Sequence, residues 1–238
     1  MKTILMKFAG PMQSWGTNSH FESRYTDFYP SKSAIIGLIA ASLGYRRHED
    51  EKIQKLNKIE FALRVDQQGK LLRDYQIAAK YKNGAFDKNY VTNRYYLEDA
   101  VFVVAISGED EIMKEIYRGL KNPYFQQFMG RRSVPVNFDF LISINDDNII
   151  SAIEKLPWQA QDWYKKENKN KEFLYLDVYA DGNLIDEKVK FRRDKVLSFS
   201  QKHRKFTFRP EGRTKVRVNN DKFADTNDEH DIFEVLGG

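Results

Sequence analysis

The sequence predicts an α+β fold, because strand-like and helix-like segments alternate along its first 145 residues. The strand-like runs are short and rich in β-branched and aromatic residues, whereas the helix-like runs repeat apolar residues every three to four positions. The strand-like runs cover 3–9, 59–65, 100–106 and 138–144, and the helix-like runs cover 34–44 and 109–120. This order predicts a ferredoxin-like (RRM-like) βαββαβ core over residues 1–145.

The first strand and the first helix have clear ends. Gly10-Pro11 stops the strand at 3–9, because proline has no N–H to donate to a sheet and fixes φ. Ser31 and Ser33 supply hydroxyl groups that cap the helix at 34–44, and Gly44 closes it. The helix is almost entirely apolar, so we expect it to be buried.

A long excursion follows the second strand. Residues 59–65 lead into a turn at 66–69 and a further extended segment at 71–76. Asn83-Gly84 favours a tight turn between extended arms, so residues 79–96 form either a projecting hairpin or a mobile loop.

The core closes with a strand, a helix and a last strand. Residues 100–106 are too β-branched for a helix and predict a central strand. Pro123 ends the following helix, and Gly130-Arg131-Arg132-Ser133 makes a basic glycine turn before the last strand.

Residues 146–220 predict a smaller, β-rich C-terminal part. It begins with a short helix at 147–156 and an exposed linker at 165–171. Its short strands are expected at 173–179, 187–193, 205–209 and 213–218. Residues 221–238 form an acidic tail, with six acids between Asp221 and Glu234.

Positive charge is concentrated in the C-terminal part. The 39 Lys and Arg exceed the 34 Asp and Glu by five in the whole chain. Residues 188–217 alone contain twelve Lys or Arg and two acids, so this stretch carries +10 and the rest −5. A local field of this size attracts polyanions, and we favour a nucleic-acid partner over a merely solvated basic face.

Several kinds of chemistry have no support in the sequence. The chain has no cysteine, which removes disulfides, thiolate zinc sites and thiol nucleophiles and fits a cytoplasmic location. Its four histidines are scattered, and no metal, phosphate-loop, dinucleotide or serine-hydrolase motif occurs. Because these motifs are missing, we expect no cofactor and no metal. The longest apolar run is about half a membrane span, so we expect no membrane partner.

The remaining candidate site combines cations, aromatic rings and a glycine turn. In Gly130-Arg131-Arg132-Ser133 the glycine permits close approach to a phosphate that two guanidinium groups and a hydroxyl contact, although an ordinary helix-to-strand connection is equally compatible. Lys32 and Ser33 lie where a helix N-terminus favours anions, or they simply cap the helix.

Aromatic residues supply stacking surfaces for unpaired bases. Gln13 and Trp15 follow the first strand and either hold a base or plug their own loop. The hairpin combines aromatic and basic side chains and buries little by itself, which favours binding. These residues are Arg73, Tyr75, Lys80, Tyr81, Lys82, Tyr90 and Arg94.

Blocks of sequence in a fixed order resemble a known family. The first block runs from Phe8 to Gly16, and the second runs from Tyr29 to Ser33 and leads into Gly37-Leu38-Ile39 and Leu43-Gly44. The later blocks are Leu72 to Tyr75, Pro123-Tyr124 and Met129 to Pro135. Lys205 to Arg209 resembles the late basic strand of the family. This pattern resembles the type I-E branch of the fifth family of CRISPR-associated proteins, which are RAMP proteins of antiviral Cascade complexes.

The resemblance implies a ferredoxin-like core with a protruding hairpin thumb, placed here at about residues 73–96. It implies a non-catalytic subunit that binds the 5′ repeat-derived tag of the CRISPR RNA, caps a backbone of CasC-type subunits and contacts a CasA-type large subunit. The resemblance also implies that the subunit contacts target DNA only indirectly, through the complex. The RNA-binding residues expected in addition to the hairpin are Gln13, Trp15, Lys32, Ser33, Gly130, Arg131, Arg132, Ser133, Lys202, Lys205 and Arg209.

A nuclease is the alternative. The type I-C relatives cleave precursor RNA without metal, using Tyr, Lys and His. No histidine lies in the glycine loop or the hairpin of this chain, and His203 beside Lys205 is the candidate catalytic pair if RNA is cleaved.

Overall fold

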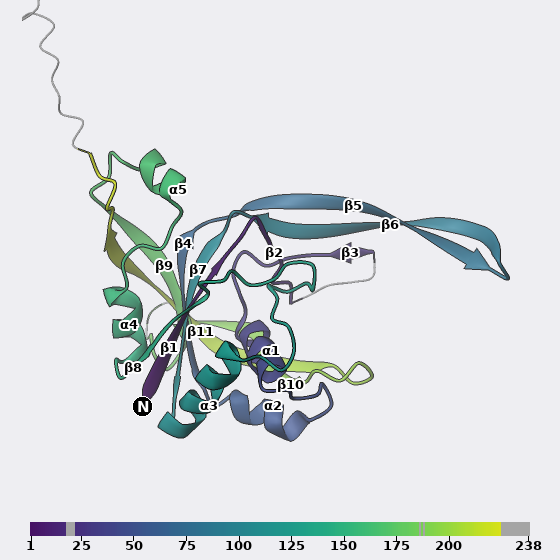
Figure 1. Ribbon diagram of the computed structural model, residues 1–238, viewed down its shortest axis with the longest axis horizontal. Helices are drawn as coiled ribbons and strands as arrows, with labels where there is room; N and C mark the ends of the chain where they lie inside the picture. The colour runs from purple at the N-terminus through teal and green to yellow at the C-terminus, as the bar shows by residue number, and fades with distance from the viewer. Residues whose placement is uncertain (18–21, 186, 188, 225–238) are drawn as a thin grey trace, which may run out of the picture.

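The computed structural model describes residues 1–17, 22–185, 187 and 189–224. It contains a seven-stranded sheet with helices on both faces and a smaller sheet whose two long strands project far from the body (Figure 1). The predicted α+β class is confirmed.

One end of the large sheet is formed by the four strands expected for the core. These are β1 (Lys2–Ala9), β4 (Glu60–Gln67), β7 (Val101–Gly108) and β8 (Leu141–Asn145). They lie in the order β4-β7-β1-β8, and all three pairings are antiparallel. The ferredoxin-like assignment itself stays a prediction.

Alternating side chains of these strands face two separate cores. Ile4, Phe8 and Phe102 pack against the first three helices, whereas Leu5 and Val103 pack against the fourth. The helices are α1 (Lys32–Ser42), α2 (Asp50–Leu56), α3 (Asp110–Lys121) and α4 (Ile149–Lys155). Burial on both faces explains why the strands are apolar along almost their whole length.

Helix α1 begins as its sequence predicts. The Ser31 hydroxyl accepts a hydrogen bond from the Ala34 N–H at 3.2 Å. Gly44 follows the helix with φ +78°, a conformation that glycine adopts without strain.

In the described residues, no helix is both long and apolar enough to cross a membrane.

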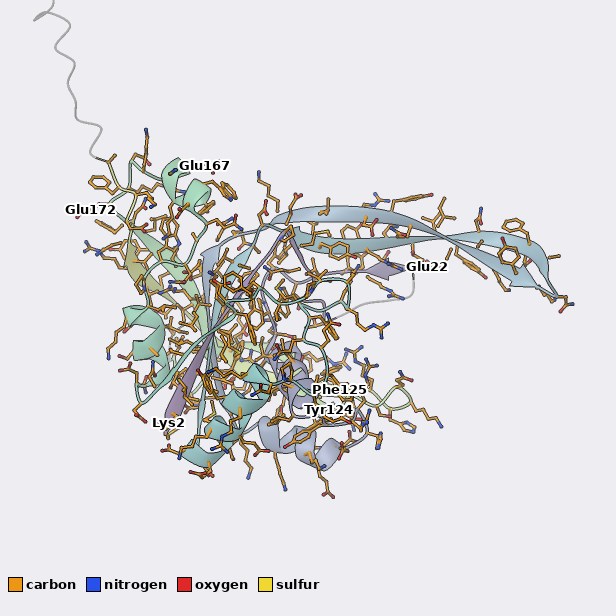
Figure 2. The ribbon with its side chains drawn as sticks, in the orientation of Figure 1. Lys2, Glu22, Tyr124, Phe125, Glu167 and Glu172 are labelled. Carbon is orange, nitrogen blue, oxygen red and sulfur yellow. The ribbon has the colours of Figure 1, made fainter. Side chains whose placement is uncertain are left out.

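The excursion after β4 is a projecting hairpin, which we call the thumb. It consists of β5 (Lys70–Lys82) and β6 (Ala85–Glu98), joined by Asn83-Gly84, whose φ angles are both positive. Two short strands, β2 (Met12–Gln13) and β3 (Ser23–Arg24), pair with the base of β6. Side chains stand out on both sides of the outer half of the thumb, where no other element lies beside it (Figure 2).

The C-terminal strands extend the core sheet. They are β9 (Phe173–Asp181), β10 (Lys190–Ser198) and β11 (Lys205–Asn219), and β9 pairs with β4. The two short strands predicted at 205–209 and 213–218 are one strand, β11. The predicted linker at 165–171 begins within helix α5 (Asp162–Glu167) and contains its second half. Residues 225–238 of the predicted tail lie outside the described residues.

Candidate nucleic-acid interface

The glycine loop rests directly on the loop that follows β1. Gly130 has φ +85°, and a Cβ atom at this position would lie 1.5 Å from the Ser14 carbonyl oxygen. The Ser14 N–H donates to the Met129 carbonyl at 3.2 Å, and the Met129 N–H donates to the Val134 carbonyl at 2.8 Å. The backbone therefore holds residues 130–133 at one place on the surface.

Arg131 joins this loop to the base of the thumb. Its Nη2 donates to the carbonyl oxygens of Arg24 and Tyr95, both at 3.1 Å. Its guanidinium carbon lies 4.1 Å from the centre of the Tyr96 ring. Arg131 thus positions the loop against β3 and β6, while Arg132 and Ser133 are exposed beside it.

Three arginines meet at the thumb base without a carboxylate partner. Arg24 and Arg94 are register partners on β3 and β6, and Arg131 bonds to the Arg24 carbonyl. Nε of Arg94 and Nη1 of Arg131 are buried and make no hydrogen bond. Among the residues that the structure describes, these arginines form no ion pair with an acid, and Asp74, opposite Arg94, accepts from Gln76 instead.

Other arginines of the chain show the opposite arrangement. Arg64, Arg209 and Arg213 each lie within 3.1 Å of a carboxylate oxygen. The thumb-base cluster, defined as Arg24, Arg94, Arg131 and Arg132, is therefore a place where cationic charge lacks internal compensation among the described residues. Guanidinium groups of this kind suit phosphate oxygens.

The predicted thumb residues are at the surface. Tyr75 and Tyr81 are more than half exposed, and Lys82 lies at the tip. Arg73 donates to the Asn93 side chain at 2.9 Å, and Lys80 pairs with Asp87 at 3.1 Å.

A second basic group lies at the turn between β10 and β11. Lys202 and His203 are exposed in the loop, and Lys205 is exposed at the first position of β11. The β10–β11 hairpin extends from the same side of the body as the thumb (Figure 1). Burial and the nearby Arg47 lower the pKa of Arg204 below its usual value, so two cations face each other in this group. Arginine stays charged even so.

Two aromatic residues that follow α3 contact Arg46, the neighbour of Arg47 in the sequence. Figure 2 labels Tyr124 and Phe125, which follow α3, and the Arg46 guanidinium lies 4.9 Å from the Phe125 ring centre. Tyr124 is two-thirds exposed.

The predicted roles of Gln13 and Trp15 are wrong for this structure. Both side chains are buried, and the Trp15 indole donates to the Gln13 side chain at 2.9 Å. The Gln13 amide donates in turn to the Ala100 carbonyl at 2.7 Å, and the Trp15 ring meets the edge of Phe8. These side chains fill the space beneath the loop after β1, so they support the glycine loop and are not accessible to a base.

The predicted direct contacts of RNA with Lys32, Ser33 and Arg209 are also wrong for this structure. All three are buried, and Ser33 meets the Ser31 hydroxyl at 3.2 Å. Lys32 Nζ donates to Asp181 at 2.7 Å, and Arg209 pairs with Asp181, Asp194 and Glu211.

Burial shifts the pKa values of Lys32 and Tyr29 in this internal network. Burial lowers the pKa of Lys32, although Asp181 partly restores it. Burial and Glu211 raise the pKa of Tyr29, whose hydroxyl donates to Glu211 at 2.9 Å. The network fastens β9, β10 and β11 to the start of α1, which is a structural role.

Sequence reasoning missed Arg24, Arg47 and Arg204. Arg24 stands in a polar loop that has no recognisable pattern, and Arg47 and Arg204 approach each other only in the fold. The signal available for Arg204 was its place within the basic stretch 188–217.

The described residues contain no group of three or more His, Asp or Glu arranged to hold a metal ion. His203 is exposed, and its basic neighbours come from its own loop.

The fold and the thumb-base cluster define a class: an α+β protein whose projecting hairpin and glycine loop meet at uncompensated arginines. The model of the family described as CRISPR-associated protein (Cas_Cas5) matches residues 3–210. The chain therefore belongs to this family of CRISPR-associated proteins.

Individual relatives agree with the family assignment. The chain is 30% identical over 204 residues to the CRISPR system Cascade subunit CasD of Escherichia coli (strain K12), covering 79% of this chain and 85% of that protein. A chain of a CRISPR RNA-guided surveillance complex superposes with a TM-score of 0.76, at 26% identity and 98% coverage of both chains. A crystal structure of a Cas protein superposes with a TM-score of 0.64, at 29% identity, covering 93% of this chain and 97% of that one.

Proposed function

We propose that this chain is a non-catalytic RNA-binding subunit of a type I-E CRISPR Cascade complex, and that it binds the 5′ repeat-derived tag of the CRISPR RNA. The observation that carries the proposal is the thumb-base cluster. There Arg24, Arg94 and Arg131 lie together with no ion pair to an acid among the described residues, and Arg132 adds an exposed cation beside them.

The glycine loop and the thumb supply the other parts of an RNA site. Arg132 and Ser133 of the glycine loop are exposed and suit a phosphate, and exposed Tyr75 and Tyr81 offer rings on which unpaired bases stack. Lys202 and Lys205 extend the positive surface on the same side of the body. Single-stranded RNA fits this combination because its bases are free to stack while its phosphates meet arginine.

The proposal also gives the chain protein partners. Ile77 and Val91 face each other across the thumb and are both largely exposed, together with Phe86 near the tip. Exposed apolar side chains on a projecting hairpin suit contact with other subunits. In the proposed complex the chain caps the CasC-type backbone and contacts the CasA-type subunit. The relative CasD is named a Cascade subunit, which supports membership of a multi-subunit complex.

The first test separates a binding subunit from a nuclease. The full chain is incubated with labelled repeat RNA in EDTA and run on native and denaturing gels. We expect a retarded, intact RNA whose binding depends on the 5′ tag. A discrete product that disappears in His203→Ala would establish the nuclease alternative instead.

Arg132→Ala tests the cluster itself. The side chain is exposed, so its removal leaves the fold intact, whereas replacing Arg131 also removes its bonds to Arg24 and Tyr95. We expect affinity for the tag RNA to fall roughly tenfold and the salt slope of binding to fall by about 0.7. Fluorescence anisotropy at several salt concentrations measures both.

Arg118→Ala is the matched control, because Arg118 is an exposed arginine on α3. It is expected to bind tag RNA with nearly wild-type affinity. Equal losses in the two variants would mean that the effect is general charge rather than this site.

A further inference from the structure

We propose that the outer face of β9 and β11 is a second binding surface for single-stranded nucleic acid, separate from the thumb base. This outer face is defined as Phe173, Tyr175, Lys215 and Arg217, together with the Asp177–Arg213 pair. The proposal goes beyond the proposed function, which places RNA at the thumb base and the neighbouring basic loops.

The face arises from strict alternation along two paired strands. Leu176, Val178, Val216 and Val218 point into the second core, and the residues between them point outward. Tyr175 lies opposite Arg217 and Asp177 opposite Lys215 in the antiparallel register. Aromatic and basic side chains therefore lie beside each other on one face.

The aromatic part of the face is available for stacking. Tyr175 is 62% exposed, and its ring meets the neighbouring Phe173 ring edge-on at a centroid distance of 5.8 Å. The Arg217 guanidinium lies 3.9 Å from the Phe173 ring centre, so one cation is already placed beside the two rings. A base that stacks on Tyr175 brings its phosphate into reach of this cation.

The charge of the face favours a polyanion. The single acid, Asp177, accepts hydrogen bonds from Arg213 through both of its oxygens and is neutralised. In the described part of the chain, neither Lys215 nor Arg217 forms an ion pair with a carboxylate. The face carries a net charge of +2 from its three cations and one acid, which is complementary to phosphates.

Single-stranded nucleic acid fits this face better than a protein does. The cores of protein interfaces are depleted in charged residues, whereas the outward residues that define this face include three cations and one acid. Sequence-tolerant single-strand binding needs the combination found here, rings for bases and cations for the backbone.

The outer face is distant from the thumb. Glu172, the residue before β9, lies on the side of the body opposite to that from which the thumb extends (Figure 2). A nucleic acid bound at the thumb base and one bound at the outer face are therefore two separate events.

The test uses the full chain and two labelled RNAs: the tag-containing repeat RNA and a 12-nucleotide oligouridine. Affinity for oligouridine is measured in an Arg132→Ala background, which weakens the thumb base. There Tyr175→Leu is expected to weaken binding roughly tenfold, and Lys215→Gln to lower the salt slope by about 0.7. Tyr175→Phe, which keeps the ring, and Lys121→Gln on α3 are the controls and are expected to change little.

Crosslinking with 4-thiouridine RNA followed by mass spectrometry locates the contact. A crosslink in the peptide that contains Tyr175 supports the proposal. Unchanged oligouridine affinity in Tyr175→Leu, with tag RNA still bound, overturns the second surface and leaves the proposed function standing. Release of a protein subunit by Tyr175→Leu with RNA affinity intact also overturns it, because the face is then a protein interface.

Discussion

Gly130→Ala is expected to displace the glycine loop and to weaken binding of tag RNA at least about tenfold. The added Cβ would lie 1.5 Å from the Ser14 carbonyl oxygen, a distance that requires backbone movement. The φ of +85° adds strain for any residue with a side chain. Because Arg131 and Arg132 follow directly, the cluster loses its geometry, and we expect the free energy of unfolding to fall by about 2–3 kcal/mol.

Gly84→Ala provides a control for the strain alone. Gly84 has a similar φ of +80°, but the space around it is open. Its replacement is expected to destabilise the chain by about 1 kcal/mol and to leave the thumb-base cluster unchanged. Urea unfolding and anisotropy are measured for both variants. Wild-type RNA affinity in Gly130→Ala would remove the glycine loop from the site.

Elements defined by local chemistry were predictable from the sequence. The capping hydroxyl of Ser31, the apolar run of β7 and the turn at Asn83-Gly84 each leave a signal within a few residues. The structure has all three, and the hairpin alternative of the 79–96 segment is the one observed. Helices α2 and α5 were missed because each has only two turns or fewer and few apolar positions.

The roles of individual cations were not predictable in the same way. Lys32 and Arg132 are both basic residues next to serine, yet Lys32 is buried against Asp181, which lies 149 positions away in the sequence. Arg132 meets no acid in the described residues and stays at the surface. Whether a cation is compensated depends on distant parts of the chain, so composition marks a basic region without identifying its free charges.

Arg64 illustrates how strongly a compensated cation affects folding, and Arg64→Met is expected to lower the free energy of unfolding by about 3–5 kcal/mol. The side chain is fully buried and donates to both oxygens of Asp66, at 2.7 and 2.8 Å. It also donates to the carbonyls of Ile153, Leu156 and Pro157. Methionine fills similar space but removes both Arg64 bonds to the buried Asp66 carboxylate, which keeps the Gln159 N–H as a donor at 2.6 Å. It also removes the Arg64 bonds to the carbonyls of Ile153 and Leu156.

Two further variants separate the causes of this loss, each measured by urea unfolding. Arg213→Met breaks an ion pair whose arginine is half exposed, and it is expected to lower stability by at most about 1 kcal/mol. Adding Asp66→Leu to Arg64→Met removes the uncompensated charge and is expected to restore about 1–2 kcal/mol. If the double variant is as unstable as Arg64→Met, the stranded carboxylate is not the source of the loss. In that case the source of the loss is the missing hydrogen bonds from Arg64 to the carbonyls of residues 153–157, because these bonds hold the segment after α4 against β4.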